Sequence, residues 1–308
     1  MNGEQRLLRN SMIVTVMLAG VGVVVGTIAG SDAIVFDGMY SLADAAMTAL
    51  ALGVARLIAA SNAADAAGGR LHERFTMGFW HLEPIVLGLN GVLLTGASIY
   101  ALVNAITALL SDGRPLSFGP AMAYAAIGTA ADIAMAVYVT RANRTVRSQL
   151  VALDARAWIM TSALGAALFV AFALGAMLQG TRHAWMTPYV DPAALVVICL
   201  VIIPAPFQTI RAAVSDILLV TPPALKLRVD GIAQATVDRY GFVSYRAYVA
   251  RVGRGTQIEL NFIVPPDTPA RRLEEWDALR DRIGEELGDD TPNRWLTIVF
   301  TTDPEWAV

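Results

Sequence analysis

Apolar residues dominate this chain up to about residue 220, where they form six long windows. A transmembrane helix needs about 20 consecutive, mostly apolar residues, because that length crosses the hydrocarbon layer of a bilayer. The windows predict spans over residues 11–29, 33–60, 84–110, 118–140, 155–178 and 191–210. We therefore expect residues 1–220 to form an all-α transmembrane domain of six helices.

Residues 221–308 follow a different pattern, and Pro222 and Pro223 mark the change because proline cannot continue a helix. Helices are predicted over residues 225–240 and 268–288, and strands over 242–251, 256–264 and 295–301. In the second strand, Ile258, Leu260 and Phe262 alternate with other residues, as in a sheet with one buried face. The order αββαβ predicts a small cytoplasmic, ferredoxin-like α+β domain whose helices cover one face of an open sheet.

Arginine is distributed unequally between the two sets of loops. One set carries Arg6, Arg9, Arg70, Arg74, Arg141, Arg144, Arg147 and Arg211, and the other carries Arg114 and Arg182. Loops rich in arginine stay in the cytoplasm. We expect an integral membrane protein with both termini in the cytoplasm, in the inner membrane of a bacterium.

The composition narrows the class further. The chain has 308 residues, of which 56% are hydrophobic and 16% charged, so it is more apolar than an average soluble domain. A net charge of -3 gives no reason to expect a nucleic-acid partner. The single Cys199 excludes a disulfide framework. His72 and His81 lie in a loop, where a histidine is more often at the membrane interface than a metal ligand. The spans contain no nucleophile-base pair, histidine cluster or phosphate loop, so an enzyme is not expected.

Polar residues in the second window point to chemistry. Asp37, Tyr40, Ser41 and Asp44 are three, four and seven residues apart, so they share one face of a helix. An ionisable residue in a membrane span costs roughly 3 kcal/mol and faces the bundle interior or a water-filled path by default. Two carboxylates and a phenol on one face predict a cation site, although a helix cap or an ion pair stays open for Asp37.

Other spans contain polar residues that could join this site. Asn90 in the third span is of the type that more often links helices than binds substrate. Asp132 in the fourth span could face the same interior as Asp44 or pair with an arginine near a helix end, and both alternatives stay open. Asp154 begins the fifth span, and Trp158 follows one turn later.

The order of these elements and three of its motifs resemble the cation diffusion facilitator family. The motifs are SDAIVFDGMYSLAD in the second span, GFWHLEP before the third and ALDARAWIMTS at the start of the fifth, and the αββαβ tail ends in Asp303-Pro304. The resemblance extends from about Arg6 to Pro304. It implies a homodimer that exports divalent transition metals from the cytoplasm in exchange for protons, with the metal as substrate and no cofactor.

The resemblance also assigns residues to the family's transport site. The four ligand positions correspond to Tyr40, Asp44, Asp154 and Trp158. Two remain carboxylates, one is a phenol, and the fourth is an indole, which cannot coordinate a metal. Asp37 matches the acid that commonly precedes the first ligand.

The expected metal site therefore consists of Asp44, Asp154, Tyr40 and Asp37, and the candidate supporting residues are Asn90, Trp158, Ser41 and Asp132. Oxygen ligands favour harder cations such as Mn²⁺ or Fe²⁺, while Zn²⁺ stays open because intrinsic affinity rises along the Irving–Williams series. A carboxylate in a low-dielectric environment tends to bind a proton when its cation leaves, which predicts proton exchange.

A non-transporting membrane scaffold or sensor is the alternative function. It is favoured by Trp158 and by the tail, where Asn261 and Thr301 stand at positions that hold histidine in the family. Asp303 is expected to be a cap or turn residue rather than a ligand.

Overall fold

The computed structural model describes residues 3–64, 79–146, 149–288 and 293–307. Its contacts divide the chain into two compact units, the first of residues 1–49 and 90–207 and the second of residues 50–89 and 208–308. This division does not coincide with the boundary expected at residue 220, which stays a prediction about where an independently folding domain begins. Each unit is described by itself below.

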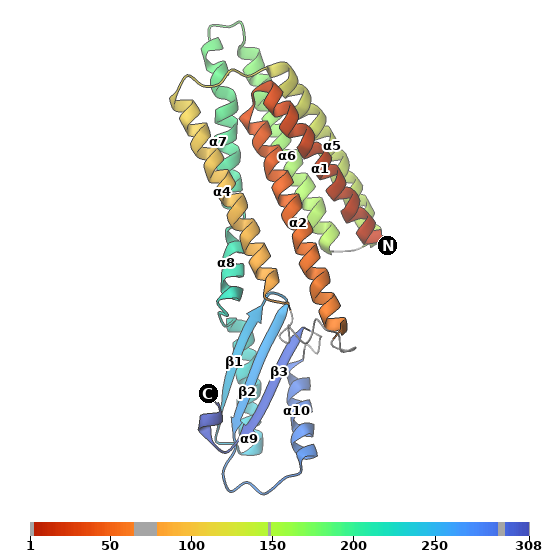
Figure 1. Ribbon diagram of the computed structural model, residues 1–308, viewed down its shortest axis with the longest axis vertical. Helices are drawn as coiled ribbons and strands as arrows, with labels where there is room; N and C mark the ends of the chain where they lie inside the picture. Colours follow the sequence, from red (N-terminus) through yellow and green to blue (C-terminus); the bar gives the residue numbers. More distant parts are fainter. Residues whose placement is uncertain (1–2, 65–78, 147–148, 289–292, 308) are drawn as a thin grey trace. The chain divides into compact units, whose positions relative to one another are not determined.

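Within the described residues, six helical segments are long and apolar enough to span a bilayer. The first five belong to α1 (Gly3–Ala29), α2 (Asp32–Ala64), α4 (Leu82–Leu110), α5 (Phe118–Val146) and α6 (Gln149–Leu178), as Figure 1 shows. The sixth extends over Ala184–Ile217. The prediction of six apolar helices is confirmed.

The sixth span is broken, although the sequence predicted one helix over residues 191–210. A short 3-10 helix, η1 (Ala184–Tyr189), leads into α7 (Val190–Ile202), and α8 (Phe207–Ile217) follows after a turn. Pro204 and Pro206 lie in that turn. Proline has no backbone N–H and its ring clashes with the preceding helical turn, so two prolines this close end the helix.

The core of the first unit combines large apolar side chains with small residues. Phe172 of α6 and Cys199 of α7 are completely buried in it. A Cβ on Gly165 of α6 would lie 2.6 Å from Thr129 Oγ1 of α5. Glycine therefore allows α5 and α6 to pack this closely, as small residues do between membrane helices.

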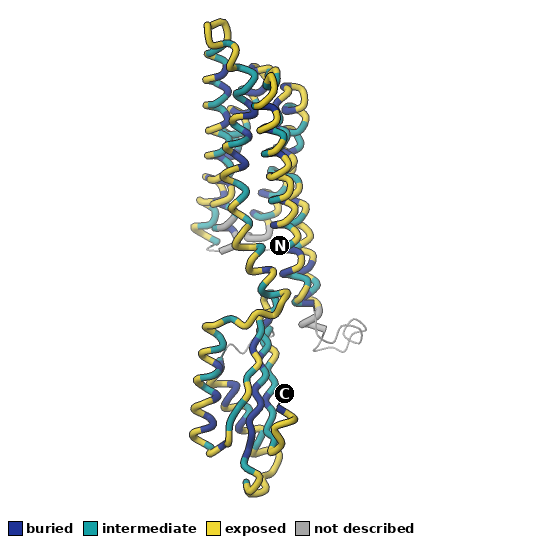
Figure 2. The backbone as a smooth tube through the Cα atoms, turned by 90° about the vertical axis from the view of Figure 1, so that its left-hand side faces the viewer, coloured by how far each residue is buried: buried dark blue, intermediate teal, exposed yellow. Residues whose placement is uncertain are grey.

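One face of α1 is apolar and exposed. Figure 2 shows exposed residues, in yellow, recurring along the helices. The exposed side chains recur every three or four residues and are Ile13, Met17, Val21, Val24 and Ile28. A continuous apolar stripe of this kind is unfavourable in water and typical of a helix face that meets lipid or another apolar surface. The stripe is consistent with a membrane-embedded helix.

A buried carboxylate joins the beginnings of α2 and α7. Asp191 is fully buried and accepts hydrogen bonds from Ser31 Oγ, from Asp32 N at 2.9 Å and from Ala33 N at 3.4 Å. Ser31 in turn caps α2, because Ile34 N donates to Ser31 Oγ at 3.1 Å. Asp191 therefore satisfies donors at a helix N-terminus that have no partner within the helix.

The C-terminal part of the second unit has the predicted order αββαβ. It consists of α9 (Pro223–Tyr240), β1 (Ser244–Val252), β2 (Gly255–Ile263), α10 (Leu273–Leu287) and β3 (Arg294–Thr301), followed by η2 (Pro304–Ala307). The sheet order is β1-β2-β3, with β1 antiparallel and β3 parallel to β2. Leu260 and Phe262 of β2 are completely buried against α9 and α10. The α+β prediction for this part is confirmed.

The segment before α4 contacts the β1–β2 hairpin, also within the second unit. Glu83 accepts hydrogen bonds from Arg254 Nε at 2.9 Å, Nη2 at 3.1 Å and backbone N at 3.1 Å. Hydrogen bonding to Glu83 raises the pKa of the Arg254 guanidinium above its ordinary value, so the pair stays ionised. Gly255 allows close contact, because a Cβ there would lie 2.4 Å from the Trp80 ring. Trp80 and Glu83 of the GFWHLEP motif thus contact the β1–β2 hairpin.

Candidate functional site

The predicted residues of α2 share one side of that helix. Asp37, Tyr40, Ser41 and Asp44 are each half-buried. The Tyr40 ring packs against Phe36, with 5.7 Å between the ring centroids. Asp37 and Asp44 are about 10 Å apart along the helix axis, given the rise of 1.5 Å per residue. They therefore lie at different depths of the same helix.

Asp44 is paired with Asn90 of α4. Asn90 Nδ2 donates to Asp44 Oδ1 at 3.3 Å. The amide oxygen, Asn90 Oδ1, is buried and has no hydrogen-bond partner in the part of the chain that the structure describes. Carboxylate and amide oxygens are ligands for hard divalent cations. We call Asp44 and Asn90 the Asp44 half-site.

Asp154 is held by a network that includes α1. Ser11 Oγ donates to Asp154 Oδ1 at 2.9 Å, and Trp158 Nε1 donates to Ser11 Oγ at 2.7 Å. Ser11 and Trp158 are buried, with exposed fractions of 2% and 6%. The second carboxylate oxygen, Asp154 Oδ2, is buried without a hydrogen-bond partner among the described residues. We call Asp154, Ser11 and Trp158 the Asp154 half-site.

Ser11 was not identified from the sequence, because a serine at the edge of an apolar window has no distinctive spacing. Trp158 was predicted as a supporting residue because its indole stands at a family ligand position. The structure gives it a specific contact, since its N–H donates to the serine that orients Asp154. Trp158 therefore stands at a position that holds a metal ligand in the family, and through Ser11 it supports the Asp154 carboxylate.

The two half-sites are separate groups of contacts. No hydrogen bond between described residues joins Asp44 to Asp154. Among the same residues, no three or more His, Cys, Asp or Glu side chains gather where they could hold a metal ion. The convergence of Asp44 and Asp154 on one cation stays a prediction.

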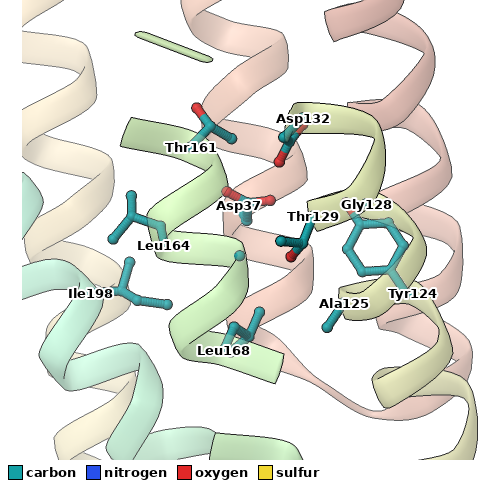
Figure 3. Close-up of a pocket in the computed structure, with 11 residues that line it drawn as sticks. Asp37, Tyr124, Ala125, Gly128, Thr129, Asp132, Thr161, Leu164, Leu168 and Ile198 are labelled. Carbon is teal, nitrogen blue, oxygen red and sulfur yellow. The ribbon is translucent and has the colours of Figure 1, made fainter. Parts of the chain in front are cut away.

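Asp37 instead lines a pocket with Asp132, as Figure 3 shows. Its volume is about 30 Å³, and its polar lining residues also include Tyr124 and Thr129 of α5 and Thr161 of α6. Asp132 thus lies at a pocket with Asp37, and a shared interior with Asp44 stays a prediction. Thr129 and Thr161 were missed by sequence reasoning, because isolated threonines in apolar spans are common.

The remaining candidates lie outside this interior. His81 is exposed just before α4, and His72 lies outside the described residues. In the tail, Asp303 Oδ1 accepts a hydrogen bond from Glu305 N at 3.0 Å, so Asp303 caps η2 as expected. Asn261 is buried in β2 with an exposed fraction of 9%.

A comparison with protein families agrees with this architecture. The family model described as the cation efflux transmembrane domain matches residues 8–218, which is more than half of the chain. No match is found among curated proteins. The match includes the six apolar helices of the described residues, except the first residues of α1, together with both half-sites and the pocket. The chain therefore belongs to the cation diffusion facilitator family, whose members transport divalent metal cations as substrates and are not enzymes in the usual sense.

Proposed function

We propose that this protein exports Mn²⁺ or Fe²⁺ from the cytoplasm in exchange for protons, through a site formed by Asp44, Asp154 and Tyr40. The observation that carries the proposal is a pair of buried oxygens without hydrogen-bond partners among the described residues, Asn90 Oδ1 and Asp154 Oδ2. Leaving a buried acceptor unpaired is costly, so such atoms are expected where a ligand binds.

The donor set supports the choice of metal. Asp44 and Asp154 supply carboxylate oxygens, Asn90 an amide oxygen and Tyr40 a phenol, and none of them supplies nitrogen or sulfur. Structural and catalytic zinc sites in proteins usually include nitrogen or sulfur ligands. Oxygen ligands suit harder cations, so we place Mn²⁺ and Fe²⁺ ahead of Zn²⁺.

The same carboxylates account for the proton exchange. Departure of a divalent cation leaves two negative charges in a low-dielectric environment, where the charged form is costly. Each of Asp44 and Asp154 then takes up a proton, and the next cation displaces these protons. Movement of the helices that carry the two half-sites would alternate access, as in other secondary transporters.

We further propose that the protein acts as a homodimer in the inner membrane of a bacterium, with both termini in the cytoplasm. The arginine-rich loops support this orientation. The exposed apolar stripe on α1 is available to lipid or to a partner helix. Residues 221–308 would then form a cytoplasmic domain.

A non-transporting scaffold or sensor is the second candidate function. The observation that favours it is the bond between Trp158 and Ser11, because the indole stands at a ligand position and cannot bind a metal. In that case metal would bind to the purified protein without any flux.

The two functions are separated by transport in proteoliposomes that contain the full chain. Uptake of Mn²⁺, Fe²⁺, Zn²⁺ and Mg²⁺ is compared with and without an imposed pH gradient, while a trapped dye reports internal pH. We expect Mn²⁺ or Fe²⁺ uptake that moves protons in the opposite direction. Uptake that ignores the pH gradient would contradict exchange, and binding without uptake of any metal would favour the scaffold or sensor.

Trp158→Phe tests whether the indole supports the Asp154 half-site. Phenylalanine keeps an aromatic ring in the core and removes the N–H that donates to Ser11. Loss of a group that orients a metal ligand typically weakens metal affinity about 10-fold to 100-fold. We expect KM for Mn²⁺ to rise about tenfold with folding intact.

The matched control is Trp185→Phe, which makes the same chemical change away from both half-sites. Trp185 lies in η1, and its side chain is 67% exposed. Equal KM values for the two variants would show that the Trp158 N–H has no part in metal binding.

A further inference from the structure

The pocket between α2, α5 and α6 contains a carboxylate that the transport site does not use. Asp132 has an exposed fraction of only 7%, and its side chain points into the pocket with Asp37 (Figure 3). No described residue forms a hydrogen bond with the Asp132 carboxylate, and the residues lining the pocket include no lysine or arginine. A buried carboxylate without such a partner is costly.

Two hydroxyl groups add unused oxygen atoms to the same pocket. Thr129 Oγ1 is buried and has no hydrogen-bond partner among the described residues. Thr161 Oγ1 donates its proton to Ala157 O at 3.1 Å, so its lone pairs remain available to a ligand. The pocket therefore contains several acceptors and lacks a positive charge.

A shared proton would not account for all of these groups. It would relieve the repulsion between Asp37 and Asp132. It would leave Thr129 Oγ1 unpaired, whereas a cation can bind hydroxyl and carboxylate oxygens together. The volume of about 30 Å³ exceeds the roughly 10–15 Å³ that a cavity needs to hold one water molecule, so a cation that has lost most of its hydration shell can fit.

We propose that Asp37 and Asp132, with Thr129 and Thr161, form a second binding site for an oxygen-preferring divalent cation such as Mn²⁺. The site lies about 10 Å from Asp44 along α2. With cytoplasmic termini, α2 begins at the outer side of the membrane, so Asp37 is nearer that side than Asp44. This orientation rests on the proposed function. The pocket would then be a second binding site that the metal occupies on its way out of the cell.

The number of bound Mn²⁺ ions tests the site. It is measured by equilibrium dialysis and Mn²⁺ electron paramagnetic resonance on the full chain in nanodiscs, in a background of Asp44→Asn with Asp154→Asn. We expect this background to bind one Mn²⁺ per chain. Addition of Asp132→Asn should weaken that binding by at least about tenfold. This is the lower end of the loss in metal affinity that follows removal of a group supporting a metal ligand.

Asparagine has nearly the shape of aspartate, so Asp132→Asn should fold, and Asp37→Asn provides a second variant with the same expected loss. Asp112→Asn is the matched control, since Asp112 is exposed in a loop. A background that binds no Mn²⁺, or binding that neither Asp37→Asn nor Asp132→Asn weakens, would overturn the proposal. Failure of the transport site alone gives another result, in which wild type and background bind equal numbers of ions.

Discussion

Asp44→Asn should reduce Mn²⁺ flux by about a hundredfold or more while the protein stays folded. Asparagine has nearly the same shape and still offers an oxygen to Asn90 Nδ2, which now donates to Asp44 at 3.3 Å. It removes the negative charge that attracts a divalent cation and the group that takes up a proton. Loss of supporting partners alone costs metal sites about 10-fold to 100-fold in affinity or activity, and a direct ligand should cost at least as much.

The measurement is initial Mn²⁺ uptake into proteoliposomes, with proton movement recorded in the same vesicles. Asp112→Asn makes the same chemical change at an exposed loop position and should transport like the wild type. Gel filtration compares the size of the two variants. If Asp44→Asn transports at the wild-type rate, Asp44 has no part in the mechanism, and the proposed transport site fails with it.

Asp191→Ala should lower the free energy of unfolding by about 3 kcal/mol or more. The carboxylate is completely buried and accepts from Ser31 Oγ, Asp32 N and Ala33 N. Alanine leaves these donors without their partner, and each unsatisfied buried group costs about 1–3 kcal/mol. The connection between the starts of α2 and α7 is also lost.

Asp32→Ala is the control for this effect. Asp32 forms an ion pair with Arg114, but both side chains are about 40% exposed, so the pair should contribute less than about 1 kcal/mol. The Asp32 backbone N–H, which donates to Asp191, is unchanged in this variant. Denaturant unfolding in detergent micelles compares the two, and similar losses of stability would mean that burial of Asp191 has no special importance.

Much of the architecture was predictable from local pattern. The apolar windows identified the helices because length and hydropathy alone decide whether a segment can cross a bilayer. The tail was predictable because Ile258, Leu260 and Phe262 alternate as a half-buried strand requires. The break after α7 was missed, although Pro204 and Pro206 signal it, because the apolar window continues through both prolines.

The candidate site was predictable only in part. Spacing on one helix grouped Asp37, Tyr40 and Asp44 on a face of α2, and their joint part in one site stays a prediction. Spacing gave no information about partners on other helices, so Ser11 and Thr129 were missed, and Asp132 could not be assigned to either of its alternatives. Those contacts depend on how α1, α5 and α6 pack, which small residues such as Gly165 permit.

From its sequence alone, this protein could be identified as a six-helix membrane protein with an αββαβ tail and acidic residues inside its second span. These properties follow from the length, periodicity and charge of single segments. Only the tertiary structure paired Asp37 with Asp132, Asp44 with Asn90, and Asp154 with Ser11 and Trp158. The physical reason is that a hydrogen bond or a shared cavity between helices depends on their depth and rotation in the bundle, which no single segment encodes.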